Sequence, residues 1–321
     1  MTIRFYSSLD TGAPALSGSP IERIRQILLA CLVNGYGTKP AAGWVIGHQN
    51  ALGFSVGNGD GFISFADSNG NSYTAKPLET ITGTSGGHAT GNNEQYSALH
   101  YNVGYVGANV HWYVIADDKT VIYYIGGNGT TADLPGVSAG ANGSAHYFGR
   151  YLNGSGLGPT FCSLGGSANA SPWIPRLSNS GNTSYGSALR NPFTNLIDQG
   201  ANPRYALACN GYRGWTIGTA AKLILQRITP IRAAVMCFGA GLSGSVQDTS
   251  MVFAGLLRGV VGDPVLSGAL LSEVLALFGQ PNTWQQRVRP ITLPNGKQWV
   301  PLYPHDSEGG YFVSLDPADW E

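Results

Sequence analysis

Charged side chains are scarce in this chain of 321 residues. Eighteen Lys and Arg balance eighteen Asp and Glu, so charged residues make up 11% of the chain and the formal net charge is +0. Soluble domains usually carry about 25% charged residues. Because there is no basic excess to displace counterions from a phosphate backbone, the composition argues against nucleic-acid binding. A neutral, charge-poor surface favours association, so we expect either an uncharged polar surface or burial against partner subunits.

Long hydrophobic runs are also lacking. The best candidate, Ala233–Phe238, is far shorter than the roughly 20 residues of a membrane span. The segment Met1–Phe5 has neither a continuous apolar run nor a small-residue cleavage site. We therefore expect no signal peptide and no membrane insertion. The apolar fraction of 43% is still large enough for a sizeable core and excludes disorder of the low-hydrophobicity kind.

Cysteine is rare, and its spacing matches neither a metal site nor a redox motif. We expect all of the cysteines to be buried, reduced thiols, because an isolated Cys behaves as a small hydrophobic residue. They are Cys31, Cys162, Cys209 and Cys237.

A capping pattern near the N-terminus predicts an amphipathic helix. Ser19 is suited to the N-cap position, Pro20 to the first helical position, and Glu22 to a contact back to the cap. Apolar residues then recur at helical spacing, and Asn34-Gly35 supplies a stop. The apolar stripe consists of Ile21, Ile24, Leu28, Cys31 and Leu32. We expect it to pack on the protein's own sheet, with a partner-binding face as the alternative. A second, shorter helix is predicted over Ser267–Phe278.

Most of the remaining chain favours strands and turns. The clearest hairpin joins Val110–Ala116 to Thr120–Ile125 through a short polar turn. Neither arm alternates strictly, so both faces of this hairpin are expected to be covered. A strand at Gly61–Ala66 leads through the turn Asp67–Asn71 to a return strand from Tyr73. Further strands are predicted at Ala145–Tyr151, Thr160–Leu164, Tyr205–Asn210, Lys222–Thr229, Met251–Leu257, Gln298–Leu302 and Tyr311–Leu315.

These elements predict a mostly β fold, a β-sandwich or barrel-like body with an N-terminal helix and a short helix in the C-terminal region. No charged or proline-rich linker interrupts residues 1–321, so we expect a single continuous domain, with a subdivision near 140–190 as the alternative. Two segments, Ile81–Asn93 and Gly165–Arg190, favour long loops. Long loops in a compact domain are often functional, which makes both segments candidates for contacts outside the subunit.

Several local patterns suggest chemistry, but none has the context that the chemistry needs. Gly83–Gly87 matches a G-x-S-x-G pattern around Ser85, with His88 behind it, yet no helix is predicted to follow. Asp117 and Asp118 are adjacent on an extended chain and should point to opposite faces, so they cannot flank one glycosidic bond. We interpret them as turn residues.

Metal and cofactor patterns are incomplete as well. Asp67, Asn69 and Asn71 have the opening spacing of a calcium loop, but Leu78 stands where a bidentate Glu is required. A hairpin turn explains the three residues better. No pair among the histidines has metalloprotease spacing; they are His48, His88, His100, His111, His146 and His305. The sequence therefore assigns no catalytic, cofactor-binding or metal-binding residue, and we expect a protein that is not an enzyme and has no cofactor.

Two N-terminal blocks carry a resemblance to known proteins. Tyr6–Pro14 (YSSLDTGAP) precedes the predicted helix, and Ala30–Trp44 (ACLVNGYGTKPAAGW) runs out of it. Together they resemble the N-terminus of a widespread group of virion structural proteins of tailed bacteriophages. Trp112–Thr120 (WYVIADDKT) is similar to a strand-turn-strand of the same group.

The resemblance continues more sparsely towards the C-terminus. Tyr147–Arg150 (YFGR) is similar to an "FFGD" strand of the group, with Arg150 in place of the acidic residue. Leu256–Gly259 (LLRG) and Val313–Trp320 also fit the group. The resemblance implies a component of the phage tail, baseplate or neck that assembles in the host cytoplasm and resides in the virion. Its implied partners are other virion proteins and further copies of itself, and it brings no catalytic motif.

Two other functions remain open from the sequence. The chain has 7 Trp, 16 Tyr and 11 Phe, and aromatic, Asn-rich loops would suit a host-surface adhesin that binds glycans. A glycan hydrolase or esterase would need two carboxylates about 5–10 Å apart, or a base near Ser85. If the chain is an assembly subunit, its few charges should gather where the particle meets water and be missing from subunit contacts.

Overall fold

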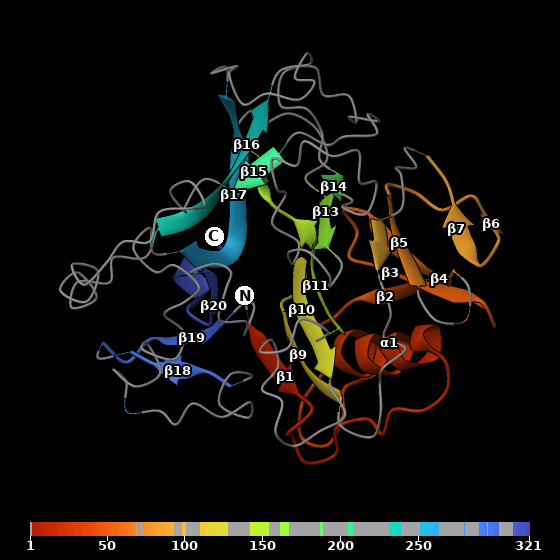
Figure 1. The fold of residues 1–321 in the computed structure, drawn as a ribbon, viewed down its shortest axis with the longest axis horizontal. Helices are drawn as coiled ribbons and strands as arrows, with labels where there is room; N and C mark the ends of the chain where they lie inside the picture. The colour runs from red at the N-terminus through yellow and green to blue at the C-terminus, as the bar shows by residue number, and fades with distance from the viewer. Residues whose placement is uncertain are drawn as a thin grey trace.

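The fold is mostly β, which confirms the predicted class. The computed structural model describes residues 2–68, 70, 73–92, 98–100, 110–127, 142–153, 161–166, 187–188, 205–207, 231–238, 251–262, 279, 289–293, 295–301 and 311–321. Within these residues the strands form four antiparallel sheets. Figure 1 shows the main helix below the orange sheet, on one side of the molecule. No described sheet closes on itself.

A six-stranded sheet forms the middle of the molecule. Its strands, in spatial order, are β1 (Arg4–Ser7), β9 (Val110–Ala116), β10 (Thr120–Gly127), β11 (Asn142–Arg150), β13 (Phe161–Gly166) and β14 (Ser187–Ala188). The predicted hairpin is confirmed as β9–β10, in which Ala116 pairs with Val121 across the polar turn. Residues 112–116 and 121–125 are all buried, so both faces of the hairpin are covered, as the lack of strict alternation predicts.

The second sheet has five strands and packs against one face of the first. They are β2 (Val45–Gln49), β3 (Gly53–Gly57), β4 (Phe62–Asp67), β5 (Tyr73–Leu78) and β8 (Ala98–His100), in that order. The predicted turn between β4 and β5 is confirmed, because the Asp67 carboxylate accepts the Gly70 N–H. A separate two-stranded hairpin, β6 (Gly83–Ser85) and β7 (His88–Thr90), lies over β3 and β4.

The third large sheet is built mainly from the C-terminal part of the chain. Its strands run in the order β15 (Tyr205–Leu207), β16 (Ile231–Phe238), β17 (Met251–Gly262), β20 (Tyr311–Ser314), β19 (Gln298–Pro301) and β18 (Ile291–Thr292), and β12 (Leu152–Asn153) pairs with β17. A one-turn 3-10 helix, η5 (Pro317–Asp319), follows β20. The hydroxyl of Tyr113 donates to the Pro301 carbonyl at 2.8 Å, so this sheet contacts the second face of the middle sheet.

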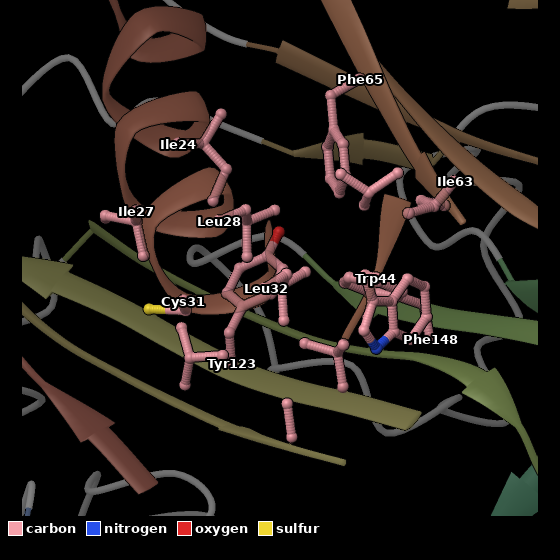
Figure 2. Close-up of a cluster of buried hydrophobic side chains, with 14 of the residues drawn as sticks. Ile24, Ile27, Leu28, Cys31, Leu32, Trp44, Ile63, Phe65, Tyr123 and Phe148 are labelled. Carbon is pink, nitrogen blue, oxygen red and sulfur yellow. The ribbon is translucent and has the colours of Figure 1, made fainter. Parts of the chain in front are cut away.

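The predicted amphipathic helix is confirmed as α1 (Pro20–Leu29), which continues as a π-helical turn over Ala30–Asn34. The backbone N–H of Ser19 donates to Glu22 Oε2 at 2.6 Å, as the capping pattern predicts. The apolar stripe packs between the five-stranded and six-stranded sheets, and so the prediction of intramolecular packing is correct. Figure 2 shows Ile24, Leu28 and Leu32 pointing into the cluster that contains Phe65 and Tyr123.

Several predictions fall outside the described residues. These are the helix over Ser267–Phe278, the strand over Lys222–Thr229, Cys209, and the part of Gly165–Arg190 between β13 and β14. Cys31 and Cys162 are buried free thiols as expected, and burial raises the pKa of each well above its usual value. No helix in the described part of the chain is long and apolar enough to cross a membrane.

Candidate functional site

The Ser85–His88 segment forms a tight hairpin, not the loop predicted over Ile81–Asn93. Ser85 ends β6, His88 begins β7, and Gly86 and Gly87 make the two-residue turn with φ of +57° and +88°. A nucleophile elbow requires a strand, a sharp turn and then a helix. Here a second strand follows the turn, so the G-x-S-x-G match is a hairpin sequence. The prediction of a long loop is wrong because a Gly-Gly pair supplies the positive φ angles that a two-residue turn requires.

Two histidines hold this hairpin on the five-stranded sheet. His88 Nε2 lies 2.7 Å from Thr74 Oγ1, and its Nδ1 lies 3.3 Å from Ser64 Oγ. His48 Nε2 lies 2.9 Å from the carbonyl oxygen of Gly87. Burial lowers the pKa of His48, which favours the neutral ring at the hairpin. Both imidazoles therefore bind β-sheet groups and serve as structural supports.

The other chemical patterns also have structural roles. Asp67 uses its carboxylate to accept the Gly70 N–H in a turn, and Asn69 and Asn71 lie outside the described residues. Among the residues that the structure describes, no three His, Cys, Asp or Glu side chains gather into a group that could hold a metal ion. Asp117 and Asp118 do diverge: the side chain of Asp117 is 0% exposed and that of Asp118 is 58% exposed.

Asp117 has a second role that the sequence does not predict, because it forms a buried ion pair with Arg258. Arg258 lies on β17, and its Nη2 donates to Asp117 Oδ2 at 2.7 Å. The side chains are 5% and 0% exposed. Asp117 Oδ1 also accepts the backbone N–H groups of Lys119 and Thr120 at 2.8 Å and 2.7 Å, which fixes the β9–β10 turn. Two of the chain's few charges thus lie inside the subunit, contrary to the expectation that the charges face water.

The remaining donors of Arg258 bind two further segments. Nη1 donates to Thr120 Oγ1 and Nε donates to the carbonyl oxygen of Trp320, both at 2.6 Å. The guanidinium also lies 5.9 Å from the centre of the Trp320 ring, within cation–π range. We call Asp117, Thr120, Arg258 and Trp320 the Arg258 network. It joins the middle sheet, β17 and the C-terminal segment in one hydrogen-bonded group.

The residue after Arg258 must be glycine, because the backbone conformation and the nearby Trp320 ring leave no room for a side chain. The φ of Gly259 is +70°, and a Cβ atom there would overlap the indole ring of Trp320. The backbone of β17 can therefore approach the ring only without a side chain at this position. The LLRG segment and the C-terminal tryptophan fit together as a unit.

The two N-terminal blocks meet in a second polar group, which we call the Asp10 cluster (Asp10, Tyr36 and Lys39). Asp10 Oδ2 accepts the Tyr36 hydroxyl at 2.7 Å and the Ser7 N–H at 2.8 Å, and lies 2.8 Å from Lys39 Nζ. Lys39 Nζ also donates to the Phe5 carbonyl oxygen at 2.6 Å. The cluster fastens the turn after α1 to the outer edge of β1.

Arg150 at the end of β11 forms an ion pair with Asp60. Its guanidinium makes a bidentate contact with Asp60, with Nε–Oδ2 at 2.8 Å and Nη2–Oδ1 at 2.6 Å. The hydrogen bonds to Asp60 raise the pKa of Arg150 above its usual value. Because Asp60 lies in the β3–β4 turn, the ion pair connects the five-stranded sheet to β11.

A buried serine–histidine contact that sequence analysis missed lies between β11 and β13. His146 Nε2 lies 2.7 Å from Ser163 Oγ, and Nδ1 lies 3.4 Å from the Tyr123 hydroxyl. The Tyr123 hydroxyl lies 3.1 Å from that of Tyr73. His146 is 0% exposed and Ser163 is 1% exposed, so no substrate can reach the pair in this conformation. The chain of hydrogen bonds links the two sheets through the core.

The exposed apolar side chains of the described surface gather on one hairpin. Val45 and Ile46 on β2 are 56% and 43% exposed, and Leu52 in the β2–β3 turn is 56% exposed. We call these three residues the β2 patch. By contrast, every described aromatic side chain with an assigned burial is buried or half-buried.

Comparison with known proteins adds no family to these observations. No protein-family model matches the chain, and no curated protein matches its sequence.

Proposed function

We propose that this protein is a structural component of a tailed-bacteriophage particle, associated with the tail, baseplate or neck and present as an oligomer. The observation that supports this role most is where the residues of the resembling segments lie in the fold. The segments that resemble phage structural proteins supply the Arg258 network and the Asp10 cluster. Both groups tie sheets, turns and termini together.

The burial of these motif residues favours a structural role over a catalytic one. Catalytic groups must touch a substrate, so they need access from solvent. Asp117 is 0% exposed and Arg258 is 4% exposed, and their polar atoms are engaged by the protein itself. Such contacts suit a subunit of an assembly, because a buried network with all its hydrogen bonds made holds the fold in one rigid arrangement.

Oligomerisation is supported by composition and by the β2 patch. The chain has 11% charged residues and no net charge, which reduces repulsion between copies. Apolar side chains that gather on one exposed hairpin are typical of a contact surface. The proposed partners are further copies of the chain and other virion proteins.

Quantitative mass spectrometry of purified particles tests the proposal. Particles of the phage that encodes the chain should contain it in several copies per virion, at a constant ratio to the major tail protein across gradient fractions. A host-cell protein that adheres to particles serves as the control, because its ratio should fall with each purification step. Absence of the chain from purified particles would refute the proposal.

A glycan array with the recombinant chain separates this role from that of an adhesin. We expect no saturable binding to bacterial surface glycans by the described surface, because its aromatic side chains are not exposed for stacking on sugars. Saturable binding to one glycan class would favour the adhesin instead.

A further inference from the structure

Among the residues that the structure describes, the five-stranded sheet ends at β2. Within the described residues β2 pairs only with β3, and no other strand or loop forms a backbone hydrogen bond to its outer side. In an antiparallel strand, alternate N–H and C=O groups point away from the paired neighbour. An exposed edge strand of this kind is a template for one more strand. In Figure 1, β2 lies at the border of the orange sheet beside α1.

The edge of the middle sheet is protected in a way that the β2 edge is not. On β1, Lys39 Nζ donates a hydrogen bond to the Phe5 carbonyl oxygen, and Asp10 Oδ2 accepts one from the Ser7 N–H. Charged side chains placed along an edge block further strand pairing. In the described part of the chain, charged side chains therefore protect the β1 edge, and none is recorded on the backbone groups of β2.

The β2 edge also lacks charge over a long segment. Residues 40–59 contain no Asp, Glu, Lys or Arg. Charged residues from other segments border the hairpin at its two ends. At the turn end, Arg25 donates to the carbonyl oxygens of Ala51 and Gly53. At the opposite end, the Asn58 side chain donates to the carbonyl oxygen of Lys119. Val45 and Ile46, both exposed, also lie at this opposite end. A β-bulge between Ile46 and His48 adds local twist but leaves residues on both sides in the ladder.

We infer that the β2 edge is a self-association surface, on which β2 of a second copy of this chain pairs antiparallel across a twofold axis. The inference rests on the proposed role as an oligomeric structural protein and names its partner. A strand is the occupant that satisfies a row of backbone donors and acceptors. Because residues 40–59 carry no charge of their own, two identical β2 edges meet without like-charge repulsion between these segments. An antiparallel pair of identical strands also satisfies the isologous contact that twofold symmetry requires.

Pairing of this kind joins the five-stranded sheets of two copies into one continuous sheet. It covers Val45 and Ile46, which project from the paired strand. Leu52 lies beyond the end of β2, in the turn, and is outside the new strand ladder. This difference provides a matched pair of variants with the same change in charge.

The test compares Ile46→Lys with Leu52→Lys by sedimentation velocity over a concentration series from about 1 to about 100 μM. Neither side chain is in the core, so both variants should fold, which far-UV circular dichroism verifies. We expect the wild type to form dimers. Ile46→Lys should raise the dimer dissociation constant at least about tenfold, because two lysines meet near the twofold axis. Leu52→Lys should change it less than about twofold.

Hydrogen exchange supplies the second readout. Amides of β2 should exchange more slowly as the concentration of wild type rises, whereas amides of β18, another sheet edge, should not change. Equal weakening by the two lysine variants, or no concentration dependence at β2, overturns the inference.

The outcomes for this surface and for the proposed function are separable. If the chain is present in particles in several copies but the recombinant protein stays monomeric over the whole series, the β2 contact is refuted and the particle role stands. If Ile46→Lys abolishes a dimer but the chain is absent from particles, the particle role is refuted and the β2 contact stands.

Discussion

The substitution Arg258→Met should destabilise the fold more than any single change on the described surface. Methionine keeps most of the side-chain volume but removes the cation, so Asp117 is left as a buried carboxylate. Removing one partner of a buried ion pair typically costs about 3–5 kcal/mol. The carbonyl oxygen of Trp320 and the hydroxyl of Thr120 also lose a donor. We therefore expect the free energy of unfolding to fall by about 3–5 kcal/mol, a large share of the roughly 5–15 kcal/mol of a typical domain.

A double-mutant cycle separates the ion pair from the other contacts. Asp117→Asn keeps an oxygen for the N–H groups of Lys119 and Thr120, so it preserves the turn while it removes the negative charge. In the double variant with Arg258→Met no charge is left buried. We expect it to be more stable than the sum of the single effects predicts, by about 1–3 kcal/mol.

Urea unfolding followed by tryptophan fluorescence measures both effects, with an unchanged dependence on denaturant showing that the unfolded states are comparable. The control is Asp118→Asn, because the side chain of Asp118 is 58% exposed and should contribute less than about 0.5 kcal/mol. The reasoning is refuted if Arg258→Met costs less than about 1 kcal/mol, or if the cycle is additive.

Three further predictions follow from the same structure. Gly259→Ala should cost about 3 kcal/mol or more in urea unfolding, because the new Cβ overlaps the Trp320 ring, whereas Gly59→Ala, which also has positive φ but open space around it, should cost only about 1 kcal/mol; equal costs would contradict the overlap. Asp10→Ala should cost about 2 kcal/mol by releasing its three donors, with Asp10→Asn intermediate, and a loss below about 0.5 kcal/mol would show that the cluster contributes little. Burial lowers the pKa of His111 to about 4, below its value of about 6.5 in an unfolded chain. The contribution of the neutral ring to stability is therefore full above about pH 6.5 and is lost as the pH falls towards 4. His111→Gln should flatten that part of a stability–pH profile, and an unchanged profile would exclude His111 as the cause.

Local signals in the sequence predict the elements whose residues act on close neighbours. The capping residues Ser19 and Glu22 lie three positions apart and fix the start of α1. The β9–β10 hairpin is predicted because its aromatic and β-branched arms are separated by only three polar residues. The pair β2–β3 is not predicted, because its glycines and lack of strict alternation give no clear strand period.

Local signals do not predict the Arg258 network, because its residues are far apart in the chain. Arg258 and Asp117 are 141 positions apart, and no local periodicity encodes their contact. One clue is present, since Arg258 is the single charged residue in the apolar strand Met251–Gly262. A charge in such a strand indicates a buried partner, but the sequence alone does not identify Asp117. The edge at β2 is likewise a property of the finished sheet.

The contact between the middle sheet and the C-terminal segments also sets the order of events during synthesis. Tyr113 bonds to Pro301, 188 positions later, and Arg258 bonds to Trp320. At translation rates of about 5–20 residues per second, the C-terminal sheet that covers the second face of the middle sheet is synthesised roughly ten seconds or more after β9. Nascent chains therefore display an uncovered apolar face that chaperones can hold. A chain that ends before residue 301 lacks the hydrogen bond between Tyr113 and Pro301, so this part of the middle sheet keeps its second face uncovered.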